Sequence, residues 1–405
     1  MNVVQILSAV RHSRAGALLI AVQIALTLTI VSNSLSIISQ RVQRMLRPSG
    51  LDEANVLIVA NQWTNPSANF TAYTQADVAA LRALPGVIDA VSTDEVPLEG
   101  SGENGWIALK PDERPASAWT GLYTLDEHGL SAFGLRLVAG RWFSPEESRF
   151  TPSPKERFPA VAVVSKALAR TLFPAGGALG KKVYYVNRFP VRIVGIVDRL
   201  EAGIQPLEND EFFASNSLIV PGRYAAPKLF YVIRTRAGRR DAVMRRIPAV
   251  LERLTSARVI DEIVTVSSIR GTSYHGARAL IIILAGLSLL ILLVTALGMV
   301  GISSYWVSRR RWQIGVRRAL GASRGDILGY LHSENLLIVG CGAALGIAGT
   351  LGVNAWLTHI LELSRIGLGV IIIGAVIVVT LGQVAVAWPA MRAASIPPGI
   401  AARVK

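Results

Sequence analysis

The side chains that could carry out chemistry in this sequence are few and scattered. Five histidines occur, and none has a partner at the spacing that a zinc site requires; they are His12, His128, His275, His332 and His359. Ser165 lacks the Gly-x-Ser-x-Gly setting that exposes a catalytic serine at a sharp strand-to-helix turn. We therefore expect no catalytic residue, no metal site and no cofactor site on this chain.

One segment superficially resembles a phosphate-binding loop. Residues 176–182 read Gly-Gly-Ala-Leu-Gly-Lys-Lys. Ala175 stands where the first glycine of such a loop belongs, and Lys182 stands where serine or threonine must hold Mg²⁺. We interpret the segment as a turn before a strand at 183–186. The chain is therefore expected not to be an enzyme, and to have no ATPase site of its own.

A basic amphipathic segment carries more information. Residues 309–323 read RRRWQIGVRRALGAS. At helical spacing its apolar side chains share one face and the arginines occupy much of the rest; that face comprises Trp312, Val316, Ala319 and Leu320. We predict a short helix here, at a membrane surface, and call residues 309–323 the coupling segment.

Start and stop signals define the ends of this helix. Gly321 stands where a glycine ends a helix, and Ser323 with Asp326 forms the capping pattern that begins the next one. Such a segment can be a topology anchor that binds anionic lipid. Its defined ends also suit a rigid lever that a partner protein grips.

The elements that must position the coupling segment are four long apolar stretches. Each contains an uncharged run of roughly 20 residues or more, which is enough to cross a membrane as a helix; we expect spans at 15–40, 278–308, 324–358 and 366–391. Glycines in the third span indicate close helix packing rather than a substrate path; they are residues 342, 346, 349 and 352.

The charge pattern predicts the orientation. The net charge is +15, but residues 40–275 hold 29 of the 42 basic and 24 of the 27 acidic residues, so most of the excess flanks the spans. That distribution fits the positive-inside rule and argues against nucleic-acid binding. The arginines of the coupling segment place it in the cytoplasm. Arg41, Arg44 and Arg47 disagree, but long domains cross the membrane largely regardless of charge.

Residues 41–277 are therefore expected outside the bacterial inner membrane, as a large α/β periplasmic domain. Strand-like and helix-like runs alternate at 54–97 and again at 228–268, which predicts a split βαβ subdomain. Residues 98–225 are rich in glycine, proline and short strands, and we interpret them as a β-rich insertion. The remaining parts are a cytoplasmic N-terminus at 1–14, a short periplasmic turn at 359–365 and a cytoplasmic tail at 392–405.

From Ile314 to Ser323 the sequence resembles the permeases of the MacB/FtsX-like (type VII) ABC transporter superfamily. The tail PAMRAASIPP at 389–398 and Glu334 match further family features. Outer segments resemble the family's periplasmic core domain; they are FGLRLVAGRWF (133–143), VVSKALARTLFPAGGALGKKV (163–183) and FPVRIVGIV (189–197). The resemblance covers nearly the whole chain, with every block in the family's order.

The resemblance implies a dimer with a second copy or a paralogue. It also implies that the coupling segment docks on a cytoplasmic ABC ATPase, which binds ATP and Mg²⁺. The expected contact residues are Trp312, Gln313, Ile314, Val316, Arg317, Arg318, Leu320 and Gly321, and Ser323, Asp326 and Glu334 are expected to be structural. Glu334 is expected to pair with an arginine of the coupling segment, such as Arg317 or Arg318. Gln313 replaces the family's usual glutamate and so loses a charge-assisted hydrogen bond.

The leading hypothesis is a permease that acts by mechanotransmission and drives export of a substrate from the periplasm, with a periplasmic adaptor and an outer-membrane exit duct as further partners. Release of lipoproteins from the inner membrane is a second hypothesis. The third is an FtsX-like mechanotransmitter or sensor that does not transport and regulates a periplasmic hydrolase or kinase. The sequence leaves the substrate open.

Overall fold

The computed structural model describes residues 14–65, 69–100, 102–148, 150–151, 158–186, 188–203, 214–361 and 366–395. Within these ranges the chain forms two compact units. One contains the N-terminal segment and everything after His275, and the other is formed by Leu46–His275. The expected cytoplasmic ends and the middle of the short turn, at 1–13, 396–405 and 362–365, lie outside the described residues.

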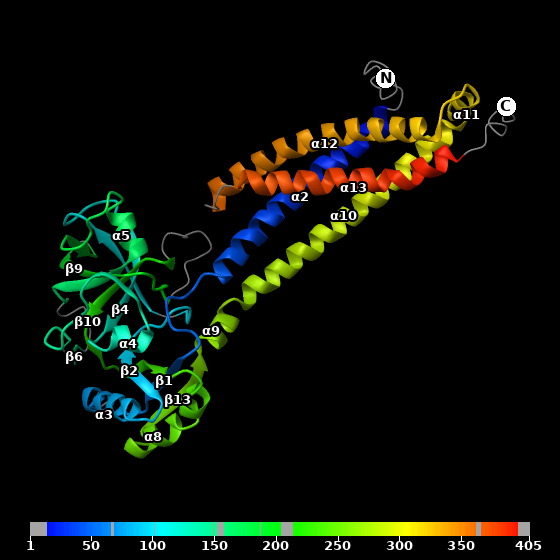
Figure 1. Ribbon diagram of the computed structural model, residues 1–405. Coiled ribbons are helices and arrows are strands. Elements are labelled where there is room, and N and C mark those ends of the chain that lie inside the picture. Colours follow the sequence, from blue (N-terminus) through cyan, green and yellow to red (C-terminus); the bar gives the residue numbers. More distant parts are fainter. Residues whose placement is uncertain are drawn as a thin grey trace. The chain divides into compact units, whose positions relative to one another are not determined.

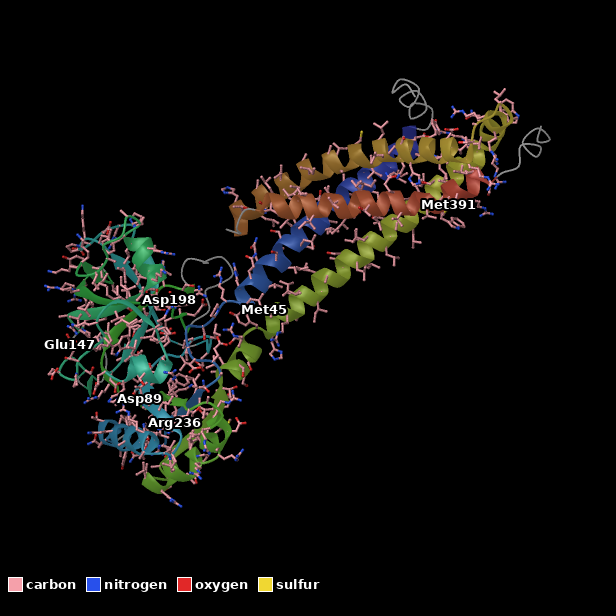
Figure 2. The ribbon with its side chains drawn as sticks, in the orientation of Figure 1. Met45, Asp89, Glu147, Asp198, Arg236 and Met391 are labelled. Atoms are coloured by element: carbon pink, nitrogen blue, oxygen red, sulfur yellow. The ribbon has the colours of Figure 1, made fainter. Side chains whose placement is uncertain are left out.

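The first unit is built from four helices that are long and apolar enough to cross a membrane. They are α2 (Arg14–Met45), α10 (His275–Arg309), α12 (Arg324–Leu361) and α13 (Leu368–Ala394). The short helix α11 (Arg311–Ala319) lies between α10 and α12. Helices α2, α12 and α13 pack side by side (Figure 1). Met45 ends α2, and Met391 lies near the end of α13 (Figure 2).

Glycines in α12 allow α2 to approach closely. A Cβ atom at Gly342 would lie 2.8 Å from the Ala21 carbonyl oxygen, and one at Gly346 would lie 2.8 Å from Leu28 Cβ. A Cβ at Gly349 would meet Thr29 Oγ1 at 2.7 Å, whereas Gly352 has nothing within 4 Å. The packing role predicted for these four glycines is therefore correct for three of them and wrong for Gly352.

The second unit contains a four-stranded sheet in the order β13-β1-β12-β2. Its strands are β1 (Val56–Trp63), β2 (Val87–Thr93), β12 (Lys228–Thr235) and β13 (Arg258–Thr265), and all neighbours are antiparallel. Helix α3 (Phe70–Arg82) joins β1 to β2, while α7 (Arg240–Met244) and α8 (Ile247–Leu254) join β12 to β13. Each βαβ unit is split by a strand of the other, so the strands of the two units alternate in one sheet.

The residues between β2 and β12 form a seven-stranded sheet in the order β5-β9-β7-β10-β4-β3-β8. The strands are β3 (Glu103–Ala108), β4 (Ala118–Leu125), β5 (Leu137–Gly140), β7 (Val161–Ser165), β8 (Lys182–Tyr185), β9 (Phe189–Val197) and β10 (Ser217–Pro221). Strand β8 also pairs with β9, so six of these strands close into a ring, and β5 pairs with β9 at its edge. The short strands β6 (Phe150–Thr151) and β11 (Arg223–Tyr224) pair with each other.

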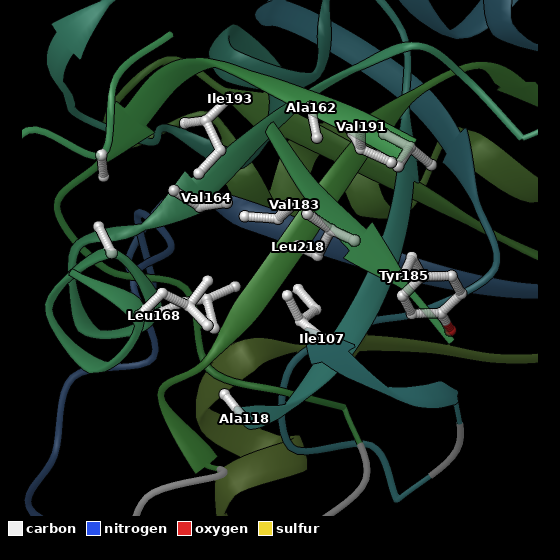
Figure 3. Packing of buried hydrophobic residues seen from close by; sticks show 14 of the residues in the cluster. Ile107, Ala118, Ala162, Val164, Leu168, Val183, Tyr185, Val191, Ile193 and Leu218 are labelled. Atoms are coloured by element: carbon white, nitrogen blue, oxygen red, sulfur yellow. The ribbon is translucent and has the colours of Figure 1, made fainter. Parts of the chain in front are cut away.

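Apolar side chains from alternate strand positions fill the ring (Figure 3). Ile107, Val164 and Leu218 are fully buried there. Helix α5 (Lys166–Leu172) contributes Leu168 to the same core. Helix α4 (Gly129–Phe133) instead packs on β2 and β12 of the smaller sheet. The architecture is thus a membrane protein with four spanning helices and a large α/β domain that carries a β-rich insertion, which confirms the predicted fold class.

Candidate coupling site

The coupling segment folds as a helix with sharply defined ends. Helix α11 covers Arg311–Ala319, its C-cap residue is Leu320, and Gly321 follows directly. Gly321 has a φ of +99°, its N–H donates to the Arg318 carbonyl at 3.2 Å, and the Ala322 N–H donates to the Arg317 carbonyl at 3.1 Å. A glycine adopts this left-handed conformation without the steric cost that a Cβ atom brings. The predicted stop signal therefore ends the helix in the structure.

A reciprocal cap begins α12. The Asp326 N–H donates to Ser323 Oγ at 3.1 Å, and the Ser323 N–H donates to Asp326 Oδ2 at 2.9 Å. The Ser323 hydroxyl also donates to Asp326 Oδ2 at 2.7 Å. Backbone N–H groups at a helix start lack intrahelical partners, so these bonds stabilise the first turn of α12. The two caps lie two residues apart and fix a short, stiff connection.

The inner face of α11 holds the helix on the ends of α12 and α13. Ile314 is buried, in one cluster with Ile327, Ala393 and Ala394. Arg318 Nη1 donates to the Ala394 carbonyl at 3.0 Å. Ile314 was expected among the residues that contact the ATPase, but it faces inward, because tertiary packing decides which face of so short a helix is covered. Ile314 therefore anchors α11 within this chain.

The outer face of α11 presents large apolar side chains to the surroundings. Leu320 is 83% exposed and Trp312 is 59% exposed, and Gln313, Val316 and Ala319 are exposed as well. Exposed apolar side chains grouped on one rigid element are typical of a protein or membrane contact surface. Arg317 is also on the exposed side, with its guanidinium 4.7 Å from the Tyr330 ring centroid. We call Trp312, Val316, Ala319 and Leu320 the outer face.

The buried acid Glu334 pairs with Arg310. Arg310 Nη1 lies 2.8 Å and 2.7 Å from the two carboxylate oxygens. An arginine of the coupling segment was expected here, and the partner in the structure is Arg310. Glu334 lies ten residues into α12, roughly 15 Å along the helix, where its carboxylate meets Arg310, the N-cap residue of α11. This ion pair joins the start of α11 to α12, which agrees with a structural role for Glu334.

Sequence reasoning also missed residues around a small hollow behind α11. Trp306, Asn335 and Pro389 line it together with the Arg310–Glu334 pair. Asn335 Nδ2 donates to the Gly382 carbonyl at 3.0 Å. Pro389 lies inside α13 and, lacking an N–H, removes one helical hydrogen bond there. A proline within an apolar run is the signal that could have marked this region.

The site offers helix surface and cationic side chains rather than reactive groups. Among the residues that the structure describes, no three His, Cys, Asp or Glu side chains gather as a metal site. Ser165, considered above as a nucleophile, is buried and caps α5 by accepting from the Leu168 N–H at 3.2 Å.

Two family models together match most of the chain. The MacB-like periplasmic core domain matches residues 17–250, and the FtsX-like permease C-terminal domain matches residues 285–398. The first match alone covers more than half of the sequence. The chain belongs to the MacB/FtsX-like permease family. The second match includes α11 with both of its caps, so the coupling segment lies inside the shared permease domain.

Curated relatives agree with this assignment. The macrolide export ATP-binding/permease protein MacB of Chromobacterium violaceum is 29% identical over 55% of this chain and 33% of its own length. The pyoverdine export ATP-binding/permease protein PvdT of Pseudomonas aeruginosa is 24% identical over 76% of this chain and 44% of its own. The chain thus spans between a third and a half of the length of these relatives.

Among solved structures, the periplasmic region of MacB from Actinobacillus actinomycetemcomitans covers 57% of this chain and 99% of its own, at 14% identity and a TM-score of 0.33. The family assignment rests on the two sequence matches.

Proposed function

We propose that this MacB/FtsX-like protein is the permease subunit of an ABC exporter and that α11 is its coupling helix. In this proposal the outer face of α11 docks on a cytoplasmic ABC ATPase, a separate chain that binds ATP and Mg²⁺. The names of the relatives combine ATP binding with permease function, which supports a pairing of the two activities. No residue of this chain is assigned a catalytic role.

The observation that carries the proposal is the contrast between the two faces of α11. Ile314, the glycine cap and the Ser323–Asp326 cap fix the helix on its own chain, while Trp312 and Leu320 remain exposed. A helix held this firmly transmits a displacement instead of absorbing it. We propose that closure of two ATPase subunits moves α11, and that α10 and α12, as helices with internally satisfied backbones, carry the movement to the Leu46–His275 unit.

This mechanism requires the coupling segment in the cytoplasm and the Leu46–His275 unit in the periplasm, with both chain ends cytoplasmic. It also requires two permeases, either two copies or a copy and a paralogue. The work done is export of a substrate from the periplasm, with an adaptor and an outer-membrane exit duct as further partners.

The first prediction concerns the outer face. Leu320→Asp places a carboxylate where the proposed interface excludes water, and burying an unpaired charge costs several kcal/mol. We expect it to reduce co-purification of the ATPase at least tenfold while membrane insertion stays intact. Leu254→Asp is the matched control, because Leu254 is an exposed leucine at the end of α8. Equal ATPase recovery from both variants would contradict the docking role.

The same purification identifies the partners outside the membrane. Recovery of a periplasmic adaptor is expected for an exporter. An acylated lipoprotein in its place would favour lipoprotein release, and a hydrolase or a histidine kinase would favour a regulatory mechanotransmitter. Each outcome leaves the role of α11 unchanged and revises only the work that the Leu46–His275 unit performs.

A further inference from the structure

Two segments of the chain connect the Leu46–His275 unit to the spanning helices. Arg270 lies in the second segment and forms hydrogen bonds with the first. The first segment is residues 46–53, which follow α2. The second is α9 (Val266–Ser273), which precedes α10. Arg270 of α9 donates from Nη1 to the Arg47 carbonyl at 2.8 Å and from Nη2 to Glu53 Oε1 at 2.5 Å. All of these residues belong to the same compact unit.

The carboxylate that receives Arg270 is itself held in place. Glu53 Oε1 accepts from the Ser49 N–H at 3.1 Å and from the Ser49 hydroxyl at 2.7 Å. Burial alone would raise the pKa of Glu53, but the hydrogen bonds from Arg270 and Ser49 outweigh it and lower the pKa below its usual value. Glu53 is therefore ionised at neutral pH, and its bond with Arg270 is a charge-assisted one. We call Arg270, Glu53 and Ser49 the clamp.

The clamp begins where sheet pairing stops. Strands β1 and β13 pair from Trp63 to Leu57, and the last pair is Leu57 with Thr265. Beyond that pair the two chain segments run toward different spanning helices without a shared ladder. Arg270 is five residues past Thr265 and Arg47 is ten residues before Leu57. The arginine therefore extends the cross-connection well beyond the end of the sheet.

Both clamped segments are also seated on the β-rich insertion. The Glu201 N–H donates to the Ser49 carbonyl at 2.9 Å, and the Ser273 hydroxyl donates to the Leu98 carbonyl. Gly50 has a φ of +97°, and a Cβ atom there would lie 2.3 Å from the Arg199 carbonyl oxygen. Only glycine allows so close an approach. Both connections therefore contact the insertion, the first through Ser49 and Gly50 and the second through Ser273.

We propose that Arg270 is a positioning residue that locks the two connections into one mechanical unit. A displacement of either spanning helix then reaches both subdomains of the Leu46–His275 unit together, instead of being absorbed by two independent linkers. The role of this lock in transmitting force from the spanning helices rests on the proposed function. The connection of the two segments by Arg270 does not depend on that function and can be measured without an ATPase.

The test uses the full chain in nanodiscs, with Cys341→Ser as background. Nitroxide labels on Leu46→Cys and Thr272→Cys, both exposed positions, report the distance between the connections by double electron–electron resonance. We expect one narrow distance distribution in the background protein. Arg270→Gln is expected to widen it at least twofold, and Arg270→Lys to widen it less, since lysine keeps the charge but cannot bridge both acceptors.

Arg136→Gln is the matched control. Arg136 also pairs with an acid, Asp198, at 2.6 Å, but its side chain is 76% exposed and it touches neither connection. A second label pair at Lys110 and Asp241, both exposed, checks the fold and is expected to stay unchanged in every variant. An unchanged Leu46–Thr272 distribution in Arg270→Gln would overturn the proposal.

The lock and the docking helix can fail separately. With the ATPase present, Arg270→Gln is expected to keep ATPase association and ATP hydrolysis while it loses most of the export. Full export by a variant whose distance distribution has widened would overturn the locking role. If Leu320→Asp retained the ATPase while Arg270→Gln still widened the distribution, docking through α11 would be refuted and the lock would stand.

Discussion

At the scale of single residues, the Leu46–His275 unit contains a fully desolvated ion pair. Arg258 of β13 donates to both carboxylate oxygens of Asp77 of α3, at 2.6 Å and 2.8 Å, and the two side chains are 2% and 0% exposed. The Tyr231 hydroxyl also donates to Asp77 at 2.5 Å, and the Arg258 guanidinium lies 4.4 Å from the Trp63 ring centroid. The pair ties α3 to the edge strand of the smaller sheet.

Removing one partner of this pair is expected to be severe. Arg258→Met leaves the Asp77 carboxylate buried without its counter-charge, and such losses cost about 3–5 kcal/mol. Replacing both partners, as Asp77→Asn with Arg258→Met, keeps an acceptor for Tyr231 and is expected to cost less than the single change. Urea unfolding of the solubilised protein measures both. A double variant no more stable than the single one would show that geometry, not charge, makes the pair important.

Asp94 makes stability depend on pH. Its carboxylate accepts from the Thr124 N–H and the Thr124 hydroxyl, at 3.1 Å each. Burial nevertheless raises the pKa of Asp94 to about 6. An acid with a raised pKa binds its proton more tightly in the folded state, so its contribution to stability is greatest below about pH 4 and is lost as the pH rises through 6.

Asp94→Asn is expected to flatten this pH dependence by about 1–2 kcal/mol between pH 4 and pH 6.5, a value reduced for the partial exposure of the side chain. Burial also raises the pKa of Glu95 and Glu201, so some dependence of the same sign remains. Glu252→Gln, at an exposed site, provides the comparison. Thermal unfolding at several pH values would contradict the assignment if Asp94→Asn kept the full slope.

At this scale the sequence revealed the local signals and missed the distant ones. Gly321, Ser323 and Asp326 were predictable, because a helix cap involves residues within four positions of one another. The partner of Glu334 was not, because the choice between Arg310 and Arg318 depends on how α11 and α12 pack together, which no local spacing specifies. The clamp escaped notice for the same reason: Glu53 and Arg270 are far apart in sequence.

At the scale of elements, α11 depends on its final glycine. Gly321→Ala places a Cβ atom in a left-handed conformation, which costs roughly 1–2 kcal/mol, although the surrounding space is open. Gly321→Pro also removes the N–H that bonds the Arg318 carbonyl and imposes a negative φ. We expect the affinity of the solubilised permease for the ATPase to be highest with glycine at position 321, lower with alanine and lowest with proline. Equal affinities would show that α11 docks without a defined end.

The strands show which elements the pattern of apolar residues in the sequence can predict. The first and last strands of the smaller sheet were predictable from apolar runs, although β13 begins at Arg258, before the Ile263–Val266 run that marks it in the sequence. The closing contact between β8 and β9 had no signal, because ring closure depends on tertiary pairing across the whole insertion. The boundaries of spanning helices were easier, since length and apolarity decide them.

At the scale of the whole molecule, the chain contains two units that differ in where they place their apolar side chains. One unit exposes apolar side chains along helices long enough to cross a membrane. The other buries its apolar residues in separate cores for the smaller sheet and the ring. Family membership was predictable because the coupling segment and the outer motifs occur in the same order as in the family. The substrate was not, because no residue pattern in the chain specifies one.

The closed ring of the insertion also determines how that subdomain responds to tension. In an open sheet, force on an edge strand breaks one hydrogen-bonded ladder and the strand peels away. Strand β8 is bonded on both sides, to β3 and to β9, so pulling it free requires two ladders to rupture at once. The six strands of the ring are therefore expected to move as a rigid body that is pushed or pulled intact, whereas β5 lies at the edge of the sheet, paired with β9.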